Sequence, residues 1–140
     1  MAPPFVHPIR VRYSECDAQG AVFNANYLAY FDVALTELWR EAIGPYGEMT
    51  ERGVDLVVAE ASVRYLSPVR FDDEVELGVE VVRLGRTALG TRMTVSRDGE
   101  LMAEGRMRHV FIDMTTGAKT EMPAYIRRAL EPYAVEETAA

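Results

Sequence analysis

The stretch that decides the fold is residues 26–42, with the sequence NYLAYFDVALTELWREA. Its apolar residues recur at helical spacing, which predicts one long helix with a single apolar stripe. They are Tyr27, Phe31, Ala34, Leu35, Leu38 and Ala42. Asn26 or Asn24 suits the N-cap, and Gly44-Pro45 ends the helix. Such a helix spans about 25 Å, enough to cross a sheet against which its stripe is buried.

The flanking residues predict strands. Residues 75–81 alternate between apolar and mostly acidic side chains, and Gly85-Arg86 and Asp98-Gly99 mark the turns into two further strands. The other expected elements are a strand at 8–13, a polar loop at 14–25, a short helix at 46–52, a strand at 56–65 and a closing helix at 123–133. We therefore predict an α+β fold: a four-stranded antiparallel meander packed on the long helix. It forms one domain, 1–140, with an ordered core at about residues 5–133.

Composition narrows the functional classes. The formal net charge of −7, without a basic run, argues against nucleic acid. No apolar run is long enough to span a membrane, and the single cysteine favours a cytoplasmic protein. A sheet with one helix leaves an open strand edge, so we expect a homo-oligomer, a dimer or a tetramer.

The chemistry points to a carboxylate. The common motifs of serine hydrolases, nucleotide-binding proteins and zinc enzymes are absent, and two histidines with one cysteine give no metal-binding pattern. Asp17 lies in the loop before the long helix, three residues ahead of Gly20. The free N–H groups of a helix N-terminus suit a developing oxyanion, and a nearby carboxylate can attack the carbonyl or activate water. On spacing alone, a loop or capping aspartate is the commoner interpretation.

Three segments carry a family resemblance. Residues 13–27, YSECDAQGAVFNANY, resemble the signature of the 4-hydroxybenzoyl-CoA thioesterase and YbgC-like hotdog family. Residues 64–74, RYLSPVRFDDE, resemble a strand junction of that family, and residues 82–87, VRLGRT, resemble its hairpin after the third strand. The resemblance covers about residues 8–115. It implies a hotdog fold and hydrolysis of an acyl-CoA to a carboxylic acid and free CoA, with no cofactor beyond the coenzyme A of the substrate.

The resemblance also assigns roles within the signature. Asp17 takes the position of the nucleophile or general base, and the backbone N–H near Asn24 takes that of the oxyanion donor. Gly20 lies beside the substrate, and Asn26 and Tyr27 shape the helix entry and the acyl pocket. Many relatives carry a histidine or an aromatic residue where this chain has Asn24. An asparagine keeps the backbone donor but cannot act as an acid or a base.

Residues outside the signature are candidates for binding the coenzyme A part of the substrate. Arg83 and Arg86, together with Arg127 and Arg128, could hold its phosphates, because guanidinium groups pair well with phosphate. Thr87 could contact the pantetheine arm or the thioester from a neighbouring subunit. It could equally be an ordinary strand threonine.

Four further residues have competing interpretations. Glu60 interrupts an apolar strand, so it is either paired, with Arg64 or with a second subunit, or a carboxylate of the pocket. Glu37 on the long helix is the rival of Asp17, although a polar helix face explains it as well. Cys16 is expected to be a small packed side chain, and His109 a hydrogen-bonded core histidine.

The favoured interpretation is an acyl-CoA thioesterase with its site at a subunit interface. One alternative keeps the chemistry but takes the acyl group from an acyl carrier protein. Another is a hotdog module that binds an acyl thioester without catalysis.

Overall fold

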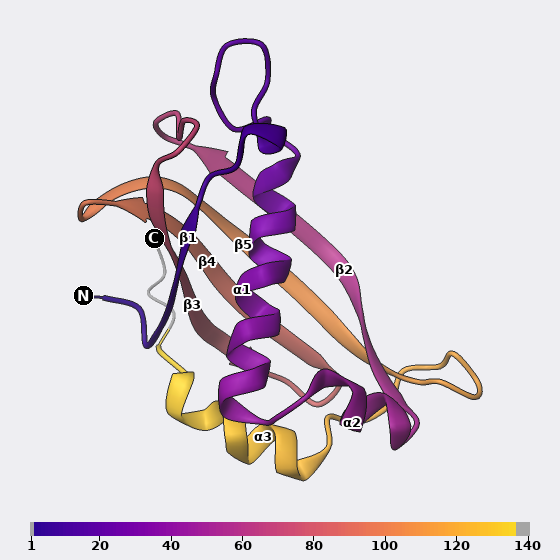
Figure 1. Cartoon of the computed structure of the whole chain (residues 1–140). Coiled ribbons are helices and arrows are strands. Elements are labelled where there is room, and N and C mark those ends of the chain that lie inside the picture. The colour runs from indigo at the N-terminus through magenta and orange to yellow at the C-terminus, as the bar shows by residue number, and fades with distance from the viewer. Residues whose placement is uncertain (1, 137–140) are drawn as a thin grey trace.

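Helix α1 (Asn26–Ala42) lies along one face of a five-stranded antiparallel sheet, as Figure 1 shows. The structure is a computed structural model that describes residues 2–136. The strands are β1 (Phe5–Arg10), β2 (Val54–Tyr65), β3 (Glu74–Leu84), β4 (Ala88–Arg97) and β5 (Glu100–Asp113). The remaining elements are α2 (Tyr46–Glu51), α3 (Ala124–Leu130) and two 3-10 turns, η1 (Tyr13–Glu15) and η2 (Glu131–Tyr133).

The strand order is β1-β3-β4-β5-β2, so only β3, β4 and β5 form a meander. The expected four-stranded meander is therefore wrong for β2, which pairs with β5 at the edge of the sheet. The link between β2 and β3 does not turn tightly, because its backbone bonds to the N-terminal loops: the Val22 N–H donates to the Val69 carbonyl, and the Phe71 N–H to the Gly20 carbonyl. The chain thereby crosses from one side of the sheet to the other.

The bounds of α1 are as predicted, and its apolar stripe is buried except for Ala42, which is half-buried. Phe31, Leu38 and Trp39 are almost fully enclosed between the helix and the sheet. Close approach is possible because β5 carries Gly105, where an added Cβ would overlap the Phe31 ring and the Ser62 carbonyl. A sheet wrapped around one helix in this way is the hotdog fold, as expected.

The predicted N-cap is wrong. Ala25 occupies that position, with φ −67° and ψ −22° and no side-chain cap. The Asn26 side chain instead donates to the Glu15 carbonyl at 2.8 Å, which ties the helix start to η1. This long-range bond replaces the local cap.

Strand β1 begins and ends earlier than predicted. It pairs with β3 from Phe5 to Arg10, and the chain then turns into η1. Pro8, which lacks an N–H, is tolerated because β1 is an edge strand. At the other end of the chain, the Val135 N–H donates to the Val81 carbonyl, and residues 137–140 lie outside the described part.

Candidate functional site

The start of α1 and the end of β2 enclose a pocket of about 280 Å³. Its walls are uncharged and mainly apolar, formed by Ala21, Val22, Asn24, Tyr27, Tyr65, Leu66, Ser67 and Pro68. Tyr27, only 3% exposed, meets the Tyr65 ring edge to face at 5.1 Å between centroids. The Tyr65 hydroxyl donates to the Asn24 carbonyl at 2.9 Å. Burial raises the pKa of Tyr27, although a hydrogen bond with the Val69 backbone partly offsets it.

The turn before α1 leaves two backbone donors free. The N–H groups of Asn26, Tyr27 and Leu28 donate to carbonyls three residues earlier in the chain. Within residues 2–136, the N–H groups of Asn24 and Ala25 have no hydrogen-bond partner. A helix N-terminus with free N–H groups favours negative charge, so this turn is suited to a developing oxyanion.

Asp17 belongs to the loop between η1 and α1. Figure 1 shows that this loop projects beyond the N-terminal end of α1. Its backbone N–H donates to the Ala21 carbonyl at 2.8 Å, and Oδ1 accepts the Gln19 N–H at 2.8 Å. Gly20 closes this loop with φ +77°, a conformation that side chains disfavour. The exposed carboxylate is not part of the pocket wall, but the same short loop supplies Ala21 and Val22 to that wall.

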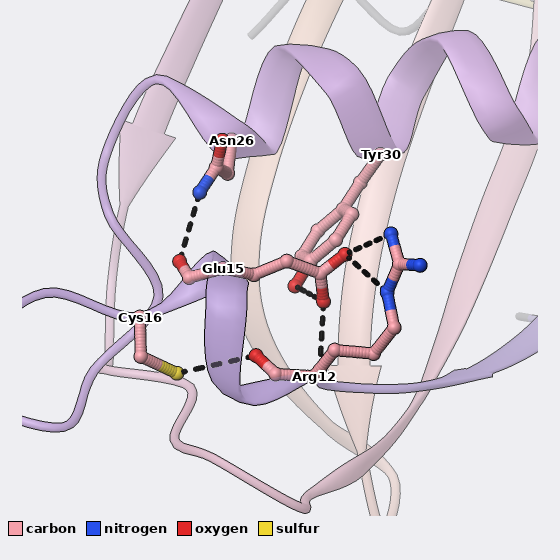
Figure 2. A network of polar contacts seen from close by, with 5 residues as sticks. All are labelled: Arg12, Glu15, Cys16, Asn26 and Tyr30. Atoms are coloured by element: carbon pink, nitrogen blue, oxygen red, sulfur yellow. Dashed lines mark hydrogen bonds and ion pairs between the residues drawn. The ribbon is translucent and has the colours of Figure 1, made fainter.

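Glu15 is the residue of the site that sequence reasoning missed, and Figure 2 shows its network. Its carboxylate accepts the Tyr30 hydroxyl at 3.0 Å, the Arg12 backbone N–H at 2.8 Å and the Arg12 guanidinium at 3.1 and 3.2 Å. Its carbonyl accepts the Asn26 side chain and the Phe23 N–H at 2.9 Å. One residue thus joins the end of the β1 segment, the loop and the helix. The sequence offered one signal for Glu15: it is a second acidic residue, two positions before Asp17 in the same loop segment.

The charges in this network shift the pKa values of its members. Burial alone would raise the pKa of Glu15, but the hydrogen bonds from Arg12 and Tyr30 lower it below its usual value. Burial, together with the bond to the Glu15 carboxylate, raises the pKa of Tyr30. The carboxylate therefore remains charged and the phenol neutral over the physiological range.

Cys16 is a poor nucleophile in this setting. Its thiol lies 3.7 Å from the Arg12 carbonyl, and burial, aided by the neighbouring carboxylates of Asp17 and Glu15, raises its pKa. A thiol that stays protonated is weakly nucleophilic, so a packed cysteine explains the geometry.

The residues expected to bind coenzyme A do not meet the pocket within one chain. The side chains of Arg83, Arg86 and Thr87 belong to the hairpin between β3 and β4. The pocket lies at the opposite end of the sheet, the end at which β2 finishes and β3 begins. The 11 residues of β3 span roughly 35 Å at the usual rise of a strand. Arg127 is engaged at the hairpin itself, where its guanidinium donates to the carbonyls of Leu84 and Gly85.

The two rival glutamates also lie apart from the pocket. Glu37 pairs with Arg40 at 2.6 Å, about 16 Å along α1 from its first residue. Glu60 is exposed on β2 and lies 3.8 Å from Arg108. The expected partner Arg64 instead pairs with Glu104 at 2.8 Å, because the two residues lie opposite each other in the register of β2 and β5.

His109 is buried on the core face of β5, as predicted. The prediction that it is hydrogen-bonded is wrong for its Nδ1. Its Nδ1 and the Thr91 hydroxyl, on neighbouring strands, have no partner among the described residues. Burial lowers the pKa of His109, and the Asp32 carboxylate on α1 partly opposes that effect.

Between residues 2 and 136, no group of three or more histidine, cysteine or acidic side chains has a geometry that could hold a metal ion. Over the same range, no helix is long and apolar enough to cross a membrane.

Comparison with known proteins gives a consistent result. The model of the Thioesterase-like superfamily matches residues 11–130. The acyl-CoA thioester hydrolase YbgC of Escherichia coli is 32% identical over 110 residues, 78% of this chain and 82% of that protein. The crystal structure of a hypothetical protein from Thermus thermophilus matches with a TM-score of 0.85 and 34% identity, covering 91% of this chain and 98% of that one. A hypothetical protein from Aquifex aeolicus matches with a TM-score of 0.87 and 28% identity, covering 91% and 100%.

Proposed function

The chain belongs to the Thioesterase-like superfamily and is a thioester hydrolase, and on this premise we propose that it hydrolyses acyl-CoA to a carboxylic acid and free CoA. The observation that carries the proposal is the pairing of a carboxylate loop with a helix start that has free N–H groups. Both border one uncharged pocket. The single cysteine supports the cytoplasm as the compartment.

In the proposed reaction, the thioester carbonyl oxygen is held by the free N–H groups at Asn24 and Ala25. Asp17 either attacks the carbonyl carbon or removes a proton from an attacking water. In the first route the C–S bond breaks, the CoA thiolate takes a proton from solvent, and water hydrolyses the resulting anhydride. In the second, the carboxylate returns the proton of water to the leaving thiolate. Because Asn24 has no titratable side chain, Asp17 works with backbone donors alone.

The pocket supports a neutral acyl group. None of its walls carries a formal charge, and the two tyrosine rings, with Val22, Leu66 and Pro68, offer apolar contact. A carboxylate carried by the acyl group, in addition to the thioester, would lose its hydration in this pocket without gaining a partner, which is costly. Gly20 and Asn26 serve this pocket indirectly, through the loop turn and the bond to Glu15.

We propose further that the site is completed by a second copy of the chain. Edge strand β2 exposes apolar side chains, including Val58 at 52% and Tyr65 at 53%, and an open edge invites pairing with another strand. Antiparallel pairing of β2 with its copy would bring the Val54 end of one strand to the Tyr65 end of the other. The hairpin with Arg83, Arg86 and Thr87 then approaches the pocket of the partner subunit and can hold the pantetheine arm and phosphates.

An acyl carrier protein remains the alternative donor of the acyl group. Carrier domains are acidic, so the net charge of −7 disfavours the docking of such a domain on this chain. A non-catalytic binding module is the second alternative.

Thiol release from a panel of acyl-CoAs tests the proposal, with Asp17→Asn as the variant. We expect activity in the parent and a loss of about a hundredfold or more in the variant, a range typical of general-base removal. The matched control is Glu74→Gln, because Glu74 is an exposed carboxylate paired with Arg10 at 3.0 Å on the β1 side of the sheet, away from edge strand β2. No release from short, long or aromatic acyl-CoA would favour the binding module. An unimpaired Asp17→Asn would transfer the role to Glu37 or Glu60.

A further inference from the structure

Tyr65, the last residue of β2, reaches across to the turn before α1. Its hydroxyl donates to the Asn24 carbonyl at 2.9 Å, and the same carbonyl accepts the Tyr27 N–H at 3.3 Å. The peptide that joins Asn24 to Ala25 is therefore held by donors from two elements that are remote in the sequence. One donor belongs to the sheet and the other to the first turn of the helix.

The opposite side of this turn is held by Glu15. Its carbonyl accepts the Phe23 N–H and the Asn26 side chain, the latter visible in Figure 2. Between these two attachments lie the N–H groups of Asn24 and Ala25, which have no partner in the described part of the chain. Without the Tyr65 hydroxyl, the turn would lose its attachment to β2 and keep that to Glu15.

We propose that Tyr65 is a positioning residue for thioester hydrolysis, because its hydroxyl fixes the turn that presents the Asn24 and Ala25 N–H groups to the substrate carbonyl. The inference rests on the proposed function. Preoriented donors stabilise an oxyanion without rearranging during the reaction, and a misplacement of about 1 Å can reduce the rate a hundredfold. The hydroxyl thus acts on the rate through the backbone and does not itself touch the reacting atoms.

A simpler role for Tyr65 is that of a pocket wall. Its ring contacts Tyr27 and lines the cavity, and this contact needs no hydroxyl. Tyr65→Phe separates the two roles, because it keeps the ring and removes the hydrogen bond. The matched control is Tyr13→Phe. Tyr13 is 80% exposed, packs its ring on Phe71, and has no hydroxyl partner among residues 2–136.

The experiment measures kcat and KM with an acyl-CoA that the parent hydrolyses, the amide NMR shifts of Asn24 and Ala25, and the thermal midpoint of unfolding. In Tyr65→Phe we expect kcat to fall about tenfold to a hundredfold with KM little changed. We also expect shifted amide signals at the two residues and an unchanged thermal midpoint. Tyr13→Phe should match the parent in all four measurements.

Unchanged kcat with unchanged amides would overturn the proposal, and so would a change confined to KM, which indicates a wall contact. If the parent releases no thiol from any acyl thioester, the proposed function fails on its own. The amide signals still decide whether Tyr65 fixes the turn: altered signals support that part, and unaltered signals refute it.

Discussion

Among the single residues, Glu15 is the one whose charge has the clearest effect on the stability of the fold. Its carboxylate is only partly exposed, at 17%, and it accepts hydrogen bonds from Arg12 and Tyr30, which lower its pKa. A carboxyl whose pKa is lower in the folded than in the unfolded protein stabilises the fold at pH values above its ordinary pKa of 4.5. This stabilisation is lost as the pH falls from 4.5 through the lower pKa that the carboxyl has in the folded protein.

Glu15→Gln tests this account. At pH 7 we expect the free energy of unfolding to fall by about 1.5–3 kcal/mol, the usual range for hydrogen bonds to a charged group. The difference from the parent should shrink as the pH falls below 4.5, because the parent carboxyl becomes protonated at its lowered pKa. Urea unfolding at several pH values measures it.

The matched control is Glu74→Gln, an exposed carboxylate paired with Arg10 at 3.0 Å, for which a loss of at most about 1 kcal/mol is expected. A Glu15→Gln difference that stays constant from pH 7 down to the pH at which the parent itself unfolds would contradict the electrostatic origin.

Only some residues of the candidate site could be predicted from the sequence. Asp17, Asn24 and Tyr27 lie in one contiguous signature, so their shared neighbourhood follows from the order of loop and helix. Tyr65 and Glu15 could not be placed in the same way. Tyr65 bonds to a residue 41 positions away, and Glu15 bonds to residues 11 and 15 positions away. Such contacts depend on how the strand and the loop pack in three dimensions.

At the scale of elements, the contact between α1 and β5 depends on one glycine. Gly105 faces Phe31, and an added Cβ would overlap both the Phe31 ring and the Ser62 carbonyl of β2. Neither can retreat easily, because the ring is buried in the core and the carbonyl belongs to a paired strand.

Gly105→Ala should therefore destabilise the protein by about 1–3 kcal/mol, the usual result of overpacking a core. Thermal and denaturant unfolding measure the loss. Gly47→Ala in α2 is the control, since its Cβ would meet no atom within 4 Å, and an alanine there should be neutral or slightly stabilising. Equal stability of the two variants would refute the close packing of α1 on β5.

The element bounds were more predictable than the element partners. The bounds of α1 follow from a regular apolar repeat and a Gly-Pro stop, and both hairpins of the meander follow from short turn sequences. The position of β2 does not, since its partner β5 is about 50 residues away and no local signal specifies the pairing. The N-cap failed for a related reason: the Asn26 side chain bonds to Glu15, a tertiary contact that overrides local preference.

At the scale of the whole molecule, one chain separates the two parts of the proposed substrate site. The pocket and Asp17 lie at one end of the sheet, and the hairpin with Arg83 and Arg86 lies roughly 35 Å away along β3. An acyl-CoA bound to one chain could reach both ends only by lying along the sheet. A two-fold pairing of β2 edges instead places the pocket of one chain near the hairpin of the other.

This arrangement predicts complementation between two defective variants. Asp17→Asn lacks the carboxylate, and the double variant Arg83→Ala with Arg86→Ala lacks the phosphate-binding charges. Each should be weakly active alone, the second through a raised KM for acyl-CoA. After unfolding and refolding together in equal amounts, half of the dimers are mixed, and each mixed dimer has one intact site. Activity should then recover to about a quarter of that of the parent.

The alternative geometry gives a different result. If Asp17 and the two arginines of one chain serve the same site, every site in a mixed dimer carries one defect, and refolding together restores nothing. Sedimentation should show both variants at twice the chain mass of 15.7 kDa, so that a failure to recover is not a failure to pair. A shortened substrate, an acyl-pantetheine without the nucleotide phosphates, supplies the internal check. The arginine variant should hydrolyse it as the parent does, whereas Asp17→Asn should not, because of the substituted groups only the carboxylate acts on the thioester.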